Sequence, residues 1–455
     1  MQQIESIITK QRNFFKQGNT KEVAFRIKYL KRLEEVIRLN EKDILEALKK
    51  DLNKAPFEAY ATEIGIVLEE LRFTIKHLRG WATPRRVRTS LVNFISTSRV
   101  YPEPYGIALI ISPWNYPFQL TLAPLIGAIA AGNCAVIKPS NESVNTSRVI
   151  EKLLKQVFDQ EYVAVVQGGR EANQSLLSQK FDYIFFTGSV AVGKVVMGAA
   201  ANNLTPVTLE LGGKSPCIVD ETADLDIAAR RIVWGKYVNA GQTCVAPDYL
   251  LVQRSVKAAL LEKMKQYIPR FYEGSGNYNE FPRIINEKHF KRLEGLIEGE
   301  KIIIGGERNL ESKLFTPTIL DQITWESRIM QEEIFGPILP VIEFQSLQEV
   351  VNKFNTLPKP LAFYYFTKSK SREKAMLKNA SFGGGCINDT IMHLVSMYSP
   401  FGGVGDSGMG GYHGKASFDT FSHHKSVLKK SIHFDMPLRY PPYKNHLKYV
   451  KMFLK

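Results

Sequence analysis

The chain has 455 residues, of which 44% are hydrophobic and 23% are charged. This is an ordinary globular composition, and the length is too great for one compact core, so we expect two or three domains. The formal net charge is +15, but the basic residues are spread along the chain and no nucleic-acid motif accompanies them. We therefore interpret them as solvated helix faces and expect no nucleic-acid partner.

The cysteines argue against a disulfide scaffold and against a metal site. There are four, with no CxxC pair and no zinc-type spacing with histidine. Such usage is typical of a reducing compartment, so we expect a cytoplasmic protein. The first residues also lack the basic start and the apolar stretch of a secretory signal.

The N-terminal part predicts helices. Apolar residues recur at helical spacing over residues 21–50, and Asn40 with Asp43 could begin a new helix there. More helix is expected to about Gly80, before Pro84 breaks it. Residues 95–104 then have the pattern of an exposed strand, which could pair with a polar strand at residues 425–434.

From residue 106 onward, five short apolar strands alternate with helices. The predicted strands are 107–111, 134–137, 162–166, 183–186 and 207–210. Strands without polar alternation are buried on both faces, as in a doubly wound parallel sheet. Such a sheet binds nucleotides at the carboxyl ends of its strands.

The apolar run 120–137 is nearly long enough to span a membrane. Pro124, Gly132 and Asn133 interrupt it, so we predict a buried helix followed by a strand, and no spanning segment. A second α/β region is expected over residues 211–415, with strands at 249–252 and 340–344.

Three motifs contain residues that could act as nucleophile, base and oxyanion donor. Cys244 ends the sequence Gly-Gln-Thr-Cys, Glu210 ends the fifth strand before two glycines, and Asn115 follows the first strand. A thiol at a turn can be a nucleophile, a half-buried carboxyl group can be a general base, and an amide can donate to an oxyanion. The alternatives are a small buried hydrophobic residue, a solvated charge and a Pro-rich turn.

Two further motifs follow strands at the same edge of the predicted sheet. Lys138 and Ser140 follow the second strand, where a lysine could meet a ribose or a phosphate. Thr187, Gly188 and Ser189 follow the fourth strand, where a glycine turn lets a pyrophosphate approach a helix N-terminus. Glycine-rich stretches at 332–337 and 400–410 indicate forced backbone geometry without naming a chemistry.

Together these motifs, in this order, resemble the aldehyde dehydrogenase superfamily over about residues 45–425. The segments 240–249, 411–415, 417–423 and 439–443 resemble the class 3, or fatty aldehyde, branch. The resemblance implies a nucleotide-binding domain at 1–83 and 105–209 and an α/β catalytic domain at 210–418. A small β bridging and oligomerisation arm would comprise 84–104 and 419–455. It also implies a homodimer.

The resemblance implies NAD(P)-dependent oxidation of an aldehyde, medium or long aliphatic or aromatic, through a thioester on Cys244. Asn115 and the Cys244 backbone N–H would hold the oxyanion, Glu210 would activate water, and Asn388 would help to shape the pocket. The cofactor, NAD or NADP, would be bound by residues shared between the two domains. These are Trp114, Lys138, Ser140, Thr187, Gly188, Ser189, Gly193, Leu211, Glu333 and Phe335.

Two departures from the family pattern and two alternative functions remain. Many members carry Glu where this chain has Asn141, and an amide would not repel a 2′-phosphate, so we expect NADP to be accepted as well as NAD. The basic tail 444–455 is too short to span a bilayer but could touch an anionic surface. The alternatives are a coenzyme A-acylating enzyme, against which Glu210 argues, and a non-catalytic protein on the same fold, against which the intact Cys244, Glu210 and Asn115 argue.

Overall fold

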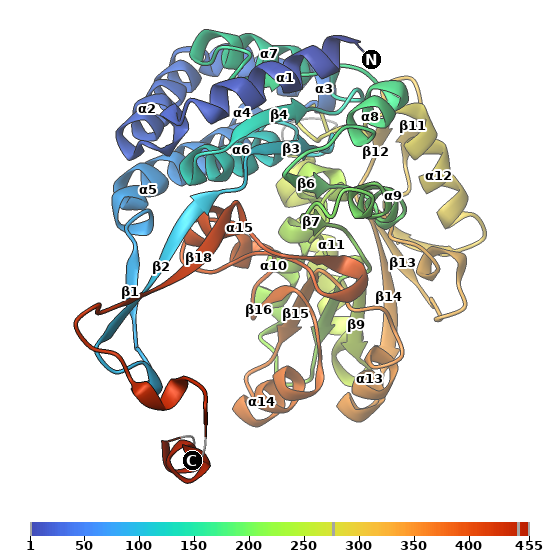
Figure 1. The fold of residues 1–455 in the computed structure, drawn as a ribbon. Coiled ribbons are helices and arrows are strands. Elements are labelled where there is room, and N and C mark those ends of the chain that lie inside the picture. The colour runs from blue at the N-terminus through green and yellow to red at the C-terminus, as the bar shows by residue number, and fades with distance from the viewer. Residues whose placement is uncertain (1, 275–277, 444–445, 454–455) are drawn as a thin grey trace.

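The fold consists of two mainly parallel β-sheets and a long β arm (Figure 1). The computed structural model describes residues 2–274, 278–443 and 446–453. Lys444, Asn445, Leu454 and Lys455, which belong to the predicted basic tail, lie outside the described residues.

The first sheet contains the five predicted parallel strands. They are β3 (Ile107–Ile111), β4 (Cys134–Lys138), β5 (Val163–Val165), β6 (Tyr183–Thr187) and β7 (Val207–Glu210). Their order is β5-β4-β3-β6-β7, and every residue of β3, β4 and β6 is buried. A sixth strand, β17 (Gly408–Met409), pairs antiparallel with β7 and brings Gly408 opposite Glu210. The prediction of a buried doubly wound sheet is confirmed, and β17 adds an edge that was not expected.

Helices surround this sheet. Those that precede it are α1 (Gln2–Lys16), α2 (Val23–Leu39), α3 (Glu41–Leu52), α4 (Pro56–Ala59) and α5 (Gly65–Trp81). Those that connect its strands are α6 (Gln119–Ala131), α7 (Val144–Val157), α8 (Arg170–Leu177) and α9 (Val190–Ala201). The apolar run 120–137 thus forms α6 and β4, as predicted, and every residue of α6 is buried. None of the helices in the described residues is long and apolar enough to cross a membrane.

The second sheet has seven strands. They are β8 (Pro216–Val219), β9 (Tyr249–Gln253), β10 (Lys301–Ile304), β13 (Thr318–Asp321), β14 (Ile338–Phe344), β15 (Ala362–Phe366) and β16 (Gly384–Ile387). The order is β10-β13-β14-β9-β8-β15-β16, with β10 antiparallel and the others parallel. Its helices are α10 (Leu225–Tyr237), α11 (Lys257–Tyr272), α12 (Glu287–Ile297), α13 (Leu347–Phe354) and α14 (Lys370–Asn379). A two-stranded ribbon of β11 (Arg308–Asn309) and β12 (Leu314–Phe315) lies between β10 and β13 in the chain.

The arm joins residues that are more than 300 positions apart. β1 (Arg85–Val87), β2 (Ser96–Pro104) and β18 (Ser422–Lys430) form a three-stranded antiparallel sheet, and β18 pairs with β2 along all nine residues. The predicted pairing is therefore confirmed, although β18 begins and ends earlier than the predicted strand 425–434. Short α15 (Lys415–Thr420) leads into β18, and α16 (Leu447–Phe453) lies at the far end of the arm, away from both sheets (Figure 1).

Candidate active site

Cys244 lies where two cavities meet between the sheets. One cavity, of about 330 Å³, and a second, of about 320 Å³, share four lining residues, which are Leu120, Thr187, Glu210 and Cys244. Of the four cysteines, all within the described residues, Cys244 alone lines these cavities. Cys134 and Cys217 are buried in strands, and the Cys386 sulfur lies 3.6 Å from Nδ1 of His393.

The turn that presents Cys244 has an unusual backbone. Asn239, Ala240 and Gly241 follow α10 with φ angles of 53°, 51° and 69°, in the left-handed region. A side chain at Gly241 would place its Cβ 2.3 Å from the carbonyl oxygen of Gly336, so the glycine is required by close backbone approach. The sequence motif Gly-Gln-Thr-Cys therefore begins in a tight turn, which brings Cys244 between the two sheets.

Glu210 is buried at the carboxyl end of β7 and lines both cavities. Neither of its carboxyl oxygens has a hydrogen-bond partner among the described residues. Burial raises the pKa of Glu210 well above its usual value. Both carboxyl oxygens are therefore available to a bound molecule.

Asn115 lies in the loop after β3 and lines the second cavity. Its side-chain nitrogen donates a hydrogen bond of 3.0 Å to the carbonyl of Gln242, two residues before Cys244. An amide nitrogen carries two hydrogens, so one remains available beside the thiol. Burial, with a smaller effect of Glu333 and Glu210, raises the pKa of the Cys244 thiol to about 12.

The second cavity contains most of the residues predicted to bind the cofactor. It is lined by Trp114, Thr187, Gly188, Ser189, Leu211, Glu333 and Phe335. The Trp114 and Phe335 rings meet edge to face at 5.4 Å. Ser189 caps α9 through a hydrogen bond from the Val192 N–H, and Gly193 packs against Leu211.

Glu333 occupies a place that only a glycine at 212 allows. A Cβ at Gly212 would lie 2.3 Å from one Glu333 carboxyl oxygen. The Oε1 atom of Glu333 is buried without a partner among the described residues, and burial raises the pKa of this carboxyl group to about 8. A buried polar oxygen without a partner is rare unless a ligand satisfies it, so Glu333 fits a ligand hydroxyl.

Three other residues lie away from the cavities. Lys138 and Ser140 follow β4 at the same sheet edge; the Lys138 Nζ donates to the Pro139 carbonyl at 2.7 Å, and burial lowers its pKa to about 8. The Asn388 side chain, expected to shape the pocket, instead donates to the carbonyl of Thr367 and accepts from its N–H, both at 2.8 Å. It fixes the ends of β15 and β16.

The first cavity is almost entirely apolar, and sequence reasoning missed its walls. Phe57, Ile66, Trp234, Ile391 and Leu394 line it, from four separate segments. His413 also lines it, and its Nδ1 lies 2.9 Å from Glu70 Oε2. The class 3 motif at 411–415 marked this histidine, but no local pattern marked the apolar wall.

Comparisons with known proteins identify relatives of this chain. A family model described as the aldehyde dehydrogenase family matches residues 1–427. A 4,4'-diaponeurosporen-aldehyde dehydrogenase of Staphylococcus aureus is 50% identical over 445 residues, covering 97% of each chain. The dimeric NADP-preferring aldehyde dehydrogenase of Canis lupus familiaris is 45% identical and covers 97% of this chain and 98% of its own.

Two solved structures are also similar. The substrate-bound state of Staphylococcus aureus AldH has a TM-score of 0.97 and 49% identity, with 99% of each chain covered. Betaine aldehyde dehydrogenase of Staphylococcus aureus in complex with NAD⁺ has a TM-score of 0.86 and 26% identity, with 96% of this chain and 89% of that chain covered.

Proposed function

The chain belongs to the aldehyde dehydrogenase family, and we propose that it oxidises apolar aldehydes to carboxylic acids through a thioester on Cys244. The observation that carries this proposal is the position of Cys244 and Glu210 at the junction of an apolar cavity and a second, more polar cavity. An aldehyde in the first cavity and a nicotinamide in the second would meet at the thiol.

The first step is attack of the Cys244 sulfur on the aldehyde carbon. A C–S bond forms, the carbonyl π electrons move to oxygen, and the thiol proton must leave. The free N–H of Asn115 and the backbone N–H of Cys244 hold the oxyanion, which can lower the barrier by several kcal/mol, about 3–4 for one donor. This proton passes through water to solvent, so Glu210 stays available to accept a proton in the hydrolysis step.

Loss of hydride and hydrolysis of the thioester follow. When bound, the cofactor supplies the acceptor for the hydride that leaves the former aldehyde carbon, so that this carbon becomes the thioester carbonyl. Glu210 then takes a proton from water, the water oxygen bonds to the carbonyl carbon, and the C–S bond breaks. The carboxylic acid is released and Cys244 is regenerated.

Residues of this chain fit the nicotinamide cofactor. Glu333, whose buried oxygen has no protein partner in the described part of the chain, would accept from a ribose hydroxyl. Gly188 and Ser189, at the N-terminus of the 12-residue helix α9, would face the pyrophosphate. Lys138 and Ser140 would lie at the adenine ribose, and Trp114 and Phe335 would pack beside the cofactor.

The first cavity supports an apolar substrate class. Its wall of aromatic and branched aliphatic side chains offers few partners for a polar substrate, so medium or long aliphatic and aromatic aldehydes fit it. Contacts with these walls would discriminate between aldehydes of different chain length, by about 1–3 kcal/mol of binding free energy per methylene.

The arm supports a homodimer. β18 is the outer strand of its sheet, and large apolar side chains on neighbouring segments, among them Leu91 and Ile432, are 82% and 92% exposed. An open strand edge beside exposed apolar side chains is a ready surface for pairing with a second chain. We propose that the arm extends a sheet of the partner.

A direct test mixes the protein with an aldehyde and NAD or NADP and follows the absorbance of the reduced cofactor. The proposal predicts turnover that Cys244→Ala abolishes, and retained turnover in that variant would refute Cys244 as the nucleophile. Reduction that depends on added coenzyme A would instead favour the acylating alternative. No reduction with any aldehyde of rising chain length would favour a non-catalytic protein.

A further inference from the structure

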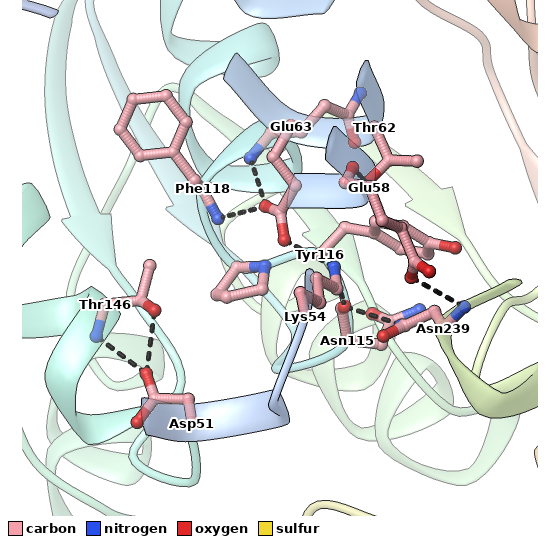
Figure 2. A network of polar contacts seen from close by, with 12 residues as sticks. Asp51, Lys54, Glu58, Thr62, Glu63, Asn115, Tyr116, Phe118, Thr146 and Asn239 are labelled. Atoms are coloured by element: carbon pink, nitrogen blue, oxygen red, sulfur yellow. Dashed lines mark hydrogen bonds and ion pairs between the residues drawn. The ribbon is translucent and has the colours of Figure 1, made fainter. Parts of the chain in front are cut away.

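A buried ion pair lies beneath the active-site loop, in a segment that carries none of the motifs described above. Lys54 and Glu63, on either side of α4, are both fully buried, with Nζ and Oε1 2.5 Å apart. Figure 2 shows the two side chains pointing toward each other beside the loop that contains Asn115. Neither residue lines either cavity, so neither touches a substrate there.

The pair holds both ends of that loop. The Lys54 Nζ donates to the main-chain carbonyl of Asn115 at 3.0 Å and lies 4.0 Å above the Tyr116 ring. The second Glu63 oxygen accepts from the backbone N–H groups of Phe118, at 2.9 Å, and Gln119, at 3.1 Å. The five residues from Asn115 to Gln119 are therefore fixed by charge-assisted hydrogen bonds to two side chains.

The same carbonyl links the loop to the turn that presents Cys244. Asn239 donates to the Asn115 carbonyl at 2.8 Å and to the Gln242 carbonyl at 3.1 Å, while the Asn115 amide donates to Gln242 at 3.0 Å. Glu58 accepts from the Asn239 N–H at 2.9 Å and so fixes the start of the turn (Figure 2). The two active-site segments thus meet at one carbonyl, which Lys54 also contacts.

Stability alone does not explain such a pair. Removing two charges from water costs several kcal/mol, and replacing a buried ion pair by apolar residues of similar volume is often neutral or stabilising. Orientation is more demanding, because a displacement of about 1 Å in a catalytic group can cost about 100-fold in rate.

We propose that Lys54 and Glu63 are positioning residues that set the direction of the Asn115 amide relative to Cys244. This inference rests on the proposed function, in which Asn115 donates to the oxyanion. Lys54 acts through Asn115, so its effect should appear in kcat and disappear when the Asn115 amide is absent.

The test compares a neutral double variant, Lys54→Met with Glu63→Gln, with the matched control Asp51→Asn. Asp51, three residues before Lys54, accepts four hydrogen bonds from Asn145 and Thr146 at the start of α7, so it stabilises the fold without contacting the active site. Thermal unfolding midpoints and steady-state kinetics with an aldehyde and NAD are measured for both. We expect the double variant to lose at least about tenfold in kcat with KM changed by less than about twofold. The control should keep its kcat, whatever its midpoint.

A double-mutant cycle shows whether the effect of Lys54 on kcat passes through Asn115. Lys54→Arg keeps a positive charge beside Glu63, but its larger head group alters the contact with the Asn115 carbonyl. It provides a second variant where the neutral pair does not fold. Its kcat should fall at least about fivefold in the native background and by less than about twofold in Asn115→Ala. Equal losses in both backgrounds, or a native kcat in folded Lys54 variants, would overturn the inference. Activity that survives in Cys244→Ala would overturn the proposed function instead, so the two failures are distinguishable.

Discussion

At the residue scale, Glu210 should control the pH dependence of thioester hydrolysis. Burial raises its pKa, so the ionised form that accepts a proton from water increases with pH over a range higher than that of an ordinary glutamate. In pre-steady-state experiments with excess aldehyde, the slow phase of cofactor reduction that follows the first hydride burst should therefore accelerate with pH. Cys244 is acylated during this phase, so its own titration does not contribute.

The matched variant is Glu210→Gln, which cannot accept the proton. Its slow phase should be at least about 100-fold slower and independent of pH, while the burst remains. An intact, pH-dependent second phase in this variant would assign the base to Glu333 or to another group.

Asn141 should decide between NAD and NADP. Its amide donates to Glu142 Oε1 at 3.2 Å, and the other Glu142 oxygen accepts from Asn286 at 2.8 Å. The neighbouring carboxylate is therefore held by two amides. Asn141→Glu adds a second negative charge, which should lower kcat/KM for NADP by about tenfold, or about 1.4 kcal/mol, and leave that for NAD nearly unchanged. Initial rates with both cofactors give the ratio of kcat/KM for NADP to that for NAD. An unchanged ratio in Asn141→Glu would contradict this role of Asn141. A strong preference of the native enzyme for NAD would contradict it as well.

The residues that sequence reasoning found share one property. Cys244 follows a glycine turn, Glu210 ends an apolar strand and Asn115 follows one, so a local pattern marks each of them. Lys54 and Glu63 could not be found in this way, because they contact a loop about 60 residues away and their sequence neighbourhood resembles any amphipathic helix. The two charges form a buried ion pair only in the folded chain, and the sequence does not show this burial.

At the element scale, the turn 239–241 depends on Gly241. Alanine in the left-handed region costs roughly 1–2 kcal/mol, and here its Cβ would also meet the Gly336 carbonyl at 2.3 Å. Gly241→Ala should therefore lower the free energy of unfolding by at least about 1 kcal/mol and reduce kcat, because Cys244 lies three residues further on. Chemical denaturation with parallel kinetics provides the measurement.

The control for this prediction is Gly198→Ala in the middle of α9. No atom lies within 4 Å of a Cβ at Gly198, and alanine favours the helix by about 0.5–1 kcal/mol. This variant should be as stable as the native enzyme or slightly more stable. If Gly241→Ala behaved in the same way, the turn would not depend on the glycine.

Longer elements were predictable and short ones were not. The helix–strand alternation from 106 to 210 follows from hydrophobic runs of four to twelve residues, and these elements lie within about two residues of their predicted ends. β17 has only two residues, and its pairing with β7 depends on a chain segment 200 positions away. The glycine-rich sequence indicated constrained backbone there without indicating a strand.

At the scale of the whole molecule, the arm should control assembly. Leu91→Glu with Ile432→Asp places charges on two of its most exposed apolar positions. We expect light scattering after size-exclusion chromatography to give twice the chain mass for the native protein and the mass of one chain for the variant. Leu204→Asp, at a 91% exposed position outside the arm, is the control and should remain dimeric. Equal masses for all three proteins would contradict an arm-mediated dimer.

We propose to retain the domain division at residues 84, 105, 210 and 419. β17 and α15 nevertheless return from the catalytic part of the chain to the first sheet, where α15 packs on α6. Local sequence patterns could predict the two sheets and the arm. They could not predict that β17 and α15 contact the first sheet, because these contacts depend on tertiary packing.

The proposed mechanism depends on a thioester on Cys244, and this intermediate can be trapped. Glu210→Gln enzyme is mixed with NADP and a medium-chain aldehyde, quenched in acid and digested for mass spectrometry. We expect the peptide containing Cys244 to gain the mass of the acyl group and to lose it on treatment with hydroxylamine. Reduced cofactor formed without an acyl group on Cys244, or with the acyl group on Cys134, Cys217 or Cys386, would contradict the account.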